Sequence, residues 1–347
     1  EVAGLALVLE SGIKFGVPVE SLLALTRSDR GLDLKSARKE IYFETSEGSY
    51  LAGKAACLLN EPAAAIRYFE KYVKLKPDDG EAYLCLGRCY YQLSDFANSY
   101  NSYSRALQIK PDDAQGLYGL GLNLLRQKNF KEAAELLEKA LTHGLESNEA
   151  FFELGSAYEE LQSYGQAASY YLKYVQSGPE RPWNGWFKLA QTYQKNNEIG
   201  KAIDAYRQAL KLRPEDINSN YNLALLLAAN QQYAEAEQAY KKLIELNPRD
   251  AVFYYNQIIQ MYDQAGQYEN ALESVKKIIE LNPKSEVAVY NLGIMYFKLN
   301  RLEEAAKTIN DCLALKNDYT SAWYNLGLVY GKMNRRQEAA EAFKKYT

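Results

Sequence analysis

The apolar and polar positions of this chain repeat at a nearly fixed step from residue 46 onward. A pair of small or apolar residues, most often Leu-Gly, returns every 34 or 35 residues. The second members of these pairs are Gly53, Gly87, Gly121, Gly155, Ala190, Ala224, Ile259, Gly293 and Gly327. A period this regular indicates stacked copies of one small structural unit.

Each copy predicts two amphipathic helices. The first half has apolar residues at helical spacing, as in Leu189 and Tyr193, and a polar break such as residues 196–198 follows it. The second half is helical again, as in Ala202 and Tyr206. The sequence therefore predicts a helix–turn–helix unit, which buries too little apolar surface to be stable without its neighbours.

Proline residues separate most copies, because proline lacks an N–H and its ring clashes with the preceding helical turn. These residues are Pro77, Pro111, Pro179, Pro214, Pro248 and Pro283. Acidic pairs follow several of them, as in Asp78-Asp79, Asp112-Asp113 and Glu215-Asp216. Acidic groups favour the start of a helix, where they meet the positive end of its dipole.

We therefore expect an all-α array of nine repeats over residues 46–347, the last one truncated. The repeats start at residues 46, 80, 114, 148, 183, 217, 252, 286 and 320. A small residue at the eighth position and an Ala at the twentieth let the two helices approach closely. Large side chains at the fourth, eleventh and twenty-fourth positions fill the remaining space.

Residues 1–45 do not follow the repeat. Helical patterning extends over residues 5–15, 19–25 and 34–43, so a short helical N-terminal segment is expected. It is interpreted either as a cap on the first repeat or as a segment for docking and self-association. Its apolar stretch is too short for a membrane span, and no basic region precedes it.

Composition narrows the classes of function. The formal net charge is −3, which argues against nucleic acid as the main partner. His143 is the single histidine, and no Ser/His/Asp set, metal-ligand spacing or phosphate-binding loop is found. The four cysteines include Cys85 and Cys89 on one helix face, interpreted as small apolar packing. We expect no enzyme activity, no cofactor and no bound metal.

The repeat pattern resembles the tetratricopeptide repeat (TPR) family. The resemblance covers residues 46–347 and implies a right-handed superhelix, in which the first helices line a concave groove. In that family the second, fifth, sixth, ninth, twelfth and thirteenth positions of each unit tend to face the groove. Such grooves bind proteins or peptides.

Two rows of groove residues are candidates for peptide binding. The fifth position is mostly aromatic, and the candidates there are Tyr118, Phe152, Phe187, Tyr221, Tyr290 and Tyr324. Packing between repeats and a path for apolar peptide side chains both remain open as interpretations. The sixth position ends in four carboxamides, Asn222, Gln257, Asn291 and Asn325. An amide side chain can both donate to and accept from a peptide backbone. The row is similar to the asparagine ladder of O-GlcNAc transferase TPR superhelices.

Charged candidates vary along the expected groove. Acidic residues in the fourth unit favour a basic segment of a partner, and the lysines of later units favour an acidic one. The acidic candidates are Glu153, Glu159 and Glu160, with Glu149 beside them, and the basic ones are Lys188, Lys298 and Lys332, with Lys195. A solvated face is the plainer interpretation of both sets. No unit has Lys at the fifth position, so a clamp for a chaperone's C-terminal carboxylate is not expected.

The sequence thus predicts a non-enzymatic scaffold that binds an extended peptide or a partner protein in its groove. Two alternatives remain open, namely the substrate-recruiting arm of a larger enzyme such as a glycosyltransferase, and a self-associating assembly subunit. The chain starts without Met and stops within a repeat, so we expect a piece of a longer protein whose targeting signals are missing. A cytoplasmic location is favoured.

Overall fold

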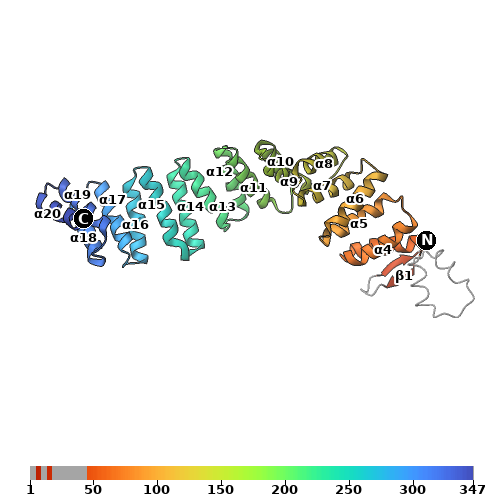
Figure 1. Cartoon of the computed structure of the whole chain (residues 1–347), viewed down its shortest axis with the longest axis horizontal. Coiled ribbons are helices and arrows are strands. Elements are labelled where there is room, and N and C mark those ends of the chain that lie inside the picture. The colour runs from red at the N-terminus through yellow and green to blue at the C-terminus, as the bar shows by residue number, and fades with distance from the viewer. Residues whose placement is uncertain (1–4, 9–13, 18–44, 347) are drawn as a thin grey trace, which may run out of the picture. The chain divides into compact units, whose positions relative to one another are not determined.

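The computed structural model describes residues 5–8, 14–17 and 45–346, and from residue 45 onward it is built from consecutive helix pairs (Figure 1). The first helices of the pairs are α3 (Ser46–Leu58), α5 (Gly80–Gln92), α7 (Ala114–Arg126), α9 (Asn148–Glu160), α11 (Pro182–Lys195), α13 (Ile217–Ala229), α15 (Ala251–Gln264), α17 (Glu286–Lys298) and α19 (Thr320–Lys332). The second helices are α4 (Pro62–Leu75), α6 (Phe96–Ile109), α8 (Phe130–Thr142), α10 (Tyr164–Gln176), α12 (Ile199–Leu212), α14 (Tyr233–Leu246), α16 (Tyr268–Leu281), α18 (Leu302–Leu315) and α20 (Arg336–Tyr346).

The first helices begin at the predicted repeat starts or one residue before them. The earlier starts are Pro182 and Ala251, where the repeat spacing is 35 residues instead of 34. A short 3₁₀ helix, η1 (Pro248–Asp250), forms the segment immediately before α15. The all-α array expected from the pattern is therefore the fold of residues 45–346.

Aspartate side chains cap several first helices. Asp79 accepts hydrogen bonds from the backbone N–H groups of Glu81 and Ala82, and Asp113 does the same for Gln115 and Gly116. Asp216 likewise caps α13. The second acidic residue of each pair after a proline is thus an N-cap, which satisfies amide groups that the helix itself leaves unpaired.

The turn inside each pair places one residue in the left-handed backbone region. It stands at the fifteenth position of every repeat, with φ between 58° and 70°. These residues are Asn60, Ser94, Lys128, Gln162, Asn197, Gln231, Gly266, Asn300 and Asn334. The turn geometry therefore recurs with the same step as the Leu-Gly pair.

The small residues at the helix crossings are buried against large ones, as the pattern predicted. A Cβ atom added to Gly327 would lie 2.6 Å from the ring of Phe343, at the twenty-fourth position of the same repeat. The alanines at the twentieth position are buried in every repeat that has one. Close helix approach in this fold therefore depends on the absence of a larger side chain.

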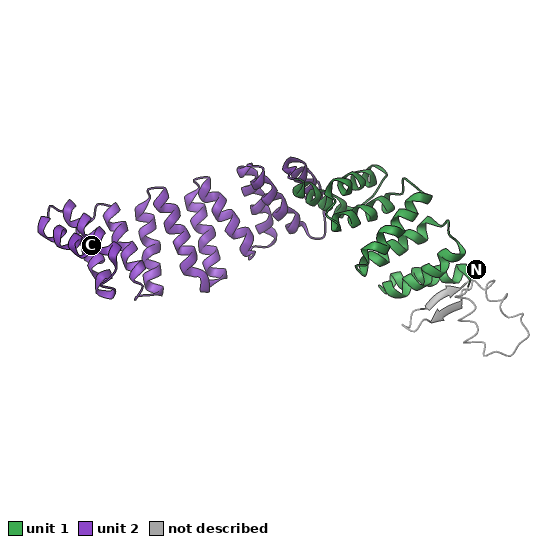
Figure 2. Cartoon of the chain, viewed as in Figure 1, with its two compact units in different colours: residues 1–161 green, residues 162–347 purple. Residues whose placement is uncertain are grey.

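The chain divides into two compact units, residues 1–161 and 162–347 (Figure 2). Within each unit, every helix packs against the next one along the chain. First helices of successive repeats also touch, as α5 and α7 do in the first unit and α17 and α19 in the second. Each unit is therefore a stack of helical repeats.

The helix expected over residues 5–15 is wrong. The structure has an antiparallel strand pair there, β1 (Leu5–Val8) and β2 (Lys14–Val17), in which Leu5 faces Val17. A short apolar run bounded by a turn signal such as Ser11-Gly12 fits a strand as well as a helix, and periodicity alone does not separate the two. The helical patterning over 19–25 and 34–43, and hence the cap or docking segment, lies outside the described residues.

Candidate functional site

The first helices of unit 1 enclose a hollow that we call the N-terminal hollow. It has a volume of about 510 Å³. Its lining residues are Lys54, Glu81, Leu84, Cys85, Arg88, Tyr91, Gln92, Tyr103, Gln115, Tyr118, Leu122 and Leu145. All but Tyr103 and Leu145 stand at the positions that the TPR resemblance assigns to the groove. The first-helix face of this unit is therefore hollowed where a groove was expected.

Lys54 and Glu81 form an ion pair beside this hollow, joining α3 to α5. Partial burial is the largest single effect and opposes the charge of Lys54, but the hydrogen bond to Glu81 and the interactions with Cys85 and Tyr50 together outweigh it and raise the pKa of the ammonium group. The same bond lowers the pKa of Glu81. Lys54 also lies over the ring of Tyr50, 5.3 Å from its centroid. These contacts hold the lysine in one place at the rim of the hollow.

The acidic candidates on α9 differ in environment. Glu153 is half-buried, and burial raises the pKa of its carboxyl group, while Arg126 acts in the opposite direction. Glu159 is half-buried as well, whereas Glu160 is exposed. Burial also raises the pKa of Tyr118 to about 12, with Glu153 adding to the effect. Glu153 is therefore part of the packed wall near Tyr118 rather than a solvated surface charge.

The aromatic candidates at the fifth position have one edge in the core. The Phe187 ring lies 5.9 Å from that of Tyr206, Tyr221 lies 6.4 Å from Tyr240, and Tyr324 lies 5.9 Å from Phe343. Each partner ring belongs to the second helix of the same repeat. Tyr324 is 42% exposed, and Tyr118, Phe152, Phe187, Tyr221 and Tyr290 are intermediate. Tyr221 also packs against the Phe253 ring of the next repeat, 6.1 Å away, so the rings contribute to packing within and between repeats and stay partly exposed.

The carboxamide candidates in unit 2 are all half-buried. Asn325 Nδ2 donates to the Tyr290 hydroxyl at 2.7 Å and to the Ser321 carbonyl at 2.9 Å. Its amide hydrogens are used inside the protein, so Oδ1 is the atom that Asn325 can offer to a ligand N–H. The bond to Tyr290 links the sixth position of one repeat to the fifth position of the preceding one.

Gln257 lines a second, smaller hollow of about 300 Å³ in unit 2, which we call the C-terminal hollow. The other residues around it are Leu225, Ala228, Ala229, Tyr233, Tyr240, Gln260, Met261 and Gln264. Leu225 is 37% exposed although it is a large apolar side chain. An exposed apolar side chain beside three glutamine amides offers both hydrophobic contact and hydrogen bonding to a peptide.

The lysine candidates of unit 2 have partners within the protein. Lys298 forms an ion pair with Asp263 and lies 5.2 Å from the centroid of the Tyr268 ring. Lys332 lies 4.7 Å from the centroid of the Phe297 ring. Lys188 is half-buried. Their charges therefore help to order the face as well as to set its potential.

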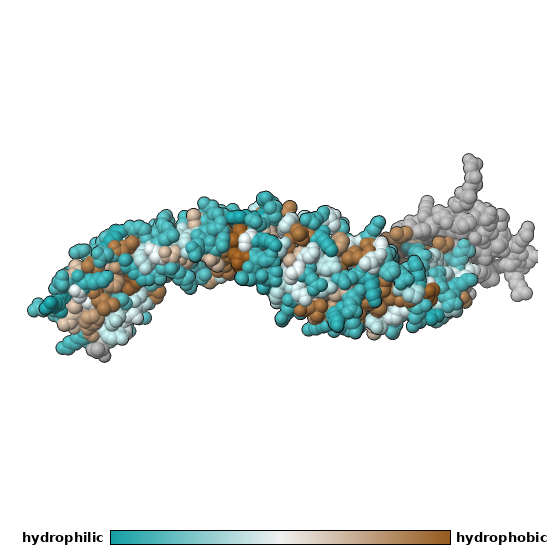
Figure 3. Space-filling view, turned by 90° about the horizontal axis from the view of Figure 1, so that it is seen from above, coloured by the Kyte–Doolittle hydropathy of each residue, from teal (hydrophilic) through white to brown (hydrophobic). Residues whose placement is uncertain are grey.

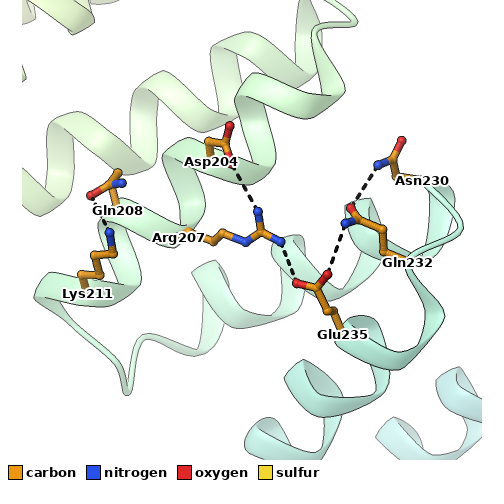
Figure 4. A network of polar contacts seen from close by, with 7 residues as sticks. All are labelled: Asp204, Arg207, Gln208, Lys211, Asn230, Gln232 and Glu235. Carbon is orange, nitrogen blue, oxygen red and sulfur yellow. Dashed lines mark hydrogen bonds and ion pairs between the residues drawn. The ribbon is translucent and has the colours of Figure 1, made fainter.

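The second helices of unit 2 carry a polar network of a different kind (Figure 4). Arg207 on α12 donates to Asp204 at 3.2 Å and to Glu235 on α14 at 2.6 Å. Gln232 also donates to Glu235, at 3.2 Å. Arg207 thereby bridges two successive repeats with exposed ion pairs, each of which contributes little to stability. The two faces of the repeat stack thus differ, since the hollows described above open on the first helices.

Comparison with protein family models identifies the family of these repeats. A model described as tetratricopeptide repeat matches residues 118–182 and 187–251. A second model, described as anaphase-promoting complex, cyclosome, subunit 3, matches residues 58–140, 230–312 and 264–346. The last two matches are offset by 34 residues, one repeat, so the repeat itself is what the model recognises. The chain belongs to the tetratricopeptide repeat family.

A solved TPR structure supports the fold, and two further structures are similar to parts of the chain. The C-terminal part of a TPR repeat-containing protein from Cytophaga hutchinsonii is 19% identical, with a TM-score of 0.52 over 69% of this chain and 98% of that one. YrrB, described as a TPR protein with an unusual peptide-binding site, is 21% identical, with a TM-score of 0.48 over 52% of this chain and 92% of that one. MamA is 20% identical, with a TM-score of 0.45 over 48% and 91%. No curated protein matches the chain.

TPR proteins in general are protein-interaction scaffolds, and membership places this chain in that broad class. Among the described residues, no three His, Cys, Asp or Glu side chains gather as metal ligands would. No helix within residues 45–346 is long and apolar enough to cross a membrane.

Sequence reasoning missed the N-terminal hollow of this TPR array. It concentrated on the fifth and sixth positions, whereas Lys54, Arg88 and Leu122 stand at the ninth position of successive repeats. The sequence did contain a signal for this hollow, because the ninth position is one of those that the TPR resemblance assigns to the groove. Gly119 explains why the sixth position carries no amide in the third repeat, since a Cβ there would collide with the Tyr103 ring.

Proposed function

We propose that this TPR array is a non-enzymatic scaffold that binds an extended peptide along the first-helix faces of its repeats. The observation that carries the proposal is the position of the two hollows. Both are lined mainly by groove positions of consecutive first helices, with Tyr103, Tyr233 and Tyr240 contributed by second helices, and both combine apolar and polar walls. Concave sites of this composition favour ligands that bury apolar side chains and hydrogen-bond at fixed points.

The N-terminal hollow suits an apolar side chain of such a peptide. Leu84, Leu122 and Tyr118 supply apolar surface, while Gln92 and Gln115 supply amides at its edge. Aromatic and aliphatic walls of this kind anchor peptide side chains through burial, and the polar edge fixes the direction of the backbone.

The carboxamides of unit 2 suit the peptide backbone. Gln257 lines the C-terminal hollow, and Asn325 presents Oδ1 while Tyr290 holds its amide nitrogen. Repeated amide contacts bind a backbone independently of its sequence, whereas charges at Glu153 and Lys188 select among partners. Changing Asn222, Asn291 and Asn325 together to Ala is expected to weaken peptide binding with little loss of helicity.

The test begins with a phage-displayed library of random peptides selected on the full chain. A selected peptide, labelled with a fluorophore, is then titrated by anisotropy against the protein and its variants. Leu225→Gln removes apolar surface from the C-terminal hollow, and Leu122→Gln does so for the N-terminal hollow. We expect at least one of the two to weaken binding by roughly tenfold, the cost of losing one buried apolar contact.

Leu212→Gln is the matched control. Leu212 is 48% exposed, comparable with Leu225, but it ends the second helix α12. Binding to this variant should equal that of the unmodified protein. If Leu212→Gln weakens binding and both hollow variants do not, the peptide binds elsewhere and the proposal is wrong.

A further inference from the structure

Two cysteines of unit 1 face one another across successive repeats. Cys57 lies near the end of α3 and Cys89 lies in α5, and their Sγ atoms are 3.5 Å apart. Both are free thiols. A disulfide bond is about 2.05 Å long, so the sulfur atoms are about 1.5 Å short of bonding distance. Small side-chain rotations cover a gap of that size.

Access to the pair is one-sided. Cys57 is half-buried and lines a hollow of about 450 Å³ together with Lys54, Leu58, Arg88 and Gln92. Cys89 is 1% exposed. A small oxidant can therefore reach Cys57 from solvent, whereas Cys89 can react only with a Cys57 sulfur that has already been oxidised.

The surroundings give the two thiols different roles. Cys57 is the thiol that reacts first, and Cys89 is the resolving thiol that reacts with it afterwards. The hydrogen bond with Cys89 holds the pKa of Cys57 below its ordinary value, and Arg88 and Lys54 act in the same direction, against the effect of burial. The hydrogen bond with Cys57 and burial raise the pKa of Cys89. The thiolate is the reactive form of cysteine, so Cys57 is the residue that attacks.

The other two cysteines lack this arrangement. Cys85 is buried, and burial raises the pKa of its thiol. Cys312 is completely buried, donates to the Glu286 carbonyl at 3.3 Å, and also has a raised pKa because of burial. Cys85 fits the packing role that the sequence suggested for Cys85 and Cys89, and the buried Cys312 serves as an internal reference.

We propose that Cys57 and Cys89 form a peroxide-reactive dithiol that closes into a disulfide between the first two repeats. This inference goes beyond peptide binding and does not depend on it. The hollow beside Cys57 shares Lys54, Arg88 and Gln92 with the N-terminal hollow, so the reaction takes place next to the proposed binding surface.

The chemistry balances with a hydroperoxide as the oxidant. The Cys57 thiolate attacks one oxygen of hydrogen peroxide, the O–O bond breaks, and Cys57 becomes a sulfenic acid while hydroxide leaves. The Cys89 sulfur then attacks the sulfenic sulfur, the S–O bond breaks, and water leaves with the Cys89 proton. Overall, two thiols lose two electrons and two protons, and one peroxide becomes two waters.

The test uses the full chain, fully reduced, treated with a small excess of hydrogen peroxide at neutral pH and quenched with N-ethylmaleimide. Non-reducing digestion and mass spectrometry should find the peptides of Cys57 and Cys89 linked to one another. Two thiols per chain should be lost, while Cys85 and Cys312 stay alkylatable after unfolding. The chain should still migrate as a monomer on a non-reducing gel.

Variants separate the two roles. In Cys89→Ser the oxidation of Cys57 should stop at the sulfenic acid, trapped with dimedone, whereas Cys312→Ser should form the disulfide at the unmodified rate. Circular dichroism checks that each variant keeps its helicity, and Cys89→Ala replaces Cys89→Ser if the hydroxyl perturbs folding. The proposal is overturned if Cys57 loses its thiol no faster than Cys312. It is equally overturned if the product is a Cys57 disulfide between two chains.

Discussion

Lys128 has a positive φ of 62°, a conformation that carries a steric cost for every residue except glycine. Seven other repeats also place a non-glycine residue there, and Gly266 alone among the described fifteenth positions is glycine. This cost was invisible in the sequence, because Asn, Ser, Lys and Gln at the turn indicate a polar break but not its backbone geometry. The positive φ at the fifteenth position is therefore set by the fold of the turn and not by the type of residue that stands there.

Replacing Lys128 with Gly is expected to stabilise the protein by about 0.5–1 kcal/mol, since the relief of strain exceeds the added freedom of the unfolded chain. The urea midpoint of unfolding, followed by circular dichroism, measures the change. Gln127→Gly is the matched control one residue away, where φ is −80°. It should destabilise the protein by a similar amount. Equal effects of both substitutions would show that the turn is not strained.

Glu153 gives a second residue-scale prediction, which depends on pH. The pKa of its carboxyl group is raised in the folded state, so the folded protein binds the proton more tightly than the unfolded chain. Its favourable contribution is complete below the unfolded pKa and is lost as pH rises through the folded one.

Glu153→Gln should therefore raise the melting temperature at about pH 7 and change it little at about pH 4. Glu160→Gln provides the comparison, because Glu160 is exposed on the same helix. Differential scanning calorimetry at both pH values measures the two variants. A gain from Glu153→Gln that is equally large at the acidic pH would contradict the assigned role of burial.

At the scale of elements, the sequence predicted the repeat helices well, but it predicted neither the strand pair nor the contacts between repeats. The helix starts follow from proline, acidic caps and apolar spacing, which are local signals. The β1–β2 pair was missed because a short apolar run is ambiguous, and the contact of Cys57 with Cys89 was missed because it joins separate repeats. Ser99 stands at the twentieth position of the second repeat, where most repeats have Ala.

The structure shows what Ser99 does between three helices. Its hydroxyl donates to the Gly87 carbonyl at 2.8 Å and accepts from Asn123 Nδ2 at 2.9 Å. Ser99 and Asn123 are both fully buried, and Asn123 Oδ1 has no hydrogen-bond partner among the described residues. Asn123 Nδ2 also donates to the Gly119 carbonyl at 2.8 Å, and the Ser99 hydroxyl is the group that links α5, α6 and α7.

Ser99→Ala should destabilise the protein by about 1–3 kcal/mol, although Ala is the usual residue at this position, because Asn123 and the Gly87 carbonyl lose a buried partner. Urea unfolding measures the effect. Ser102→Ala is the control, since its hydroxyl donates to the Asn98 carbonyl of its own helix and so links no second helix among the described residues. The double variant with Asn123→Ala should recover part of the loss. A Ser99→Ala protein as stable as the unmodified one would refute the bridging role.

At the scale of the whole molecule, the pattern predicted a repeat array, and the TPR resemblance implied that the first helices line its groove. The space-filling view shows apolar patches set among hydrophilic residues (Figure 3). The hollows could not be predicted in detail, because their shape depends on which side chains fill the inner space. Tyr103, for example, fills the place beside Gly119, and Lys54 is held at the rim by Glu81.

The central claim is that an extended peptide binds to the first helices of the repeats. Hydrogen–deuterium exchange of the full chain, with and without a saturating selected peptide, tests it most directly. The account predicts slower exchange in first helices that line the hollows, namely in α5 and α7, in α13 and α15, or in both pairs. Exchange in the second helices α6 and α12 should change little. Protection confined to the second helices, or no protection at saturation, would contradict it.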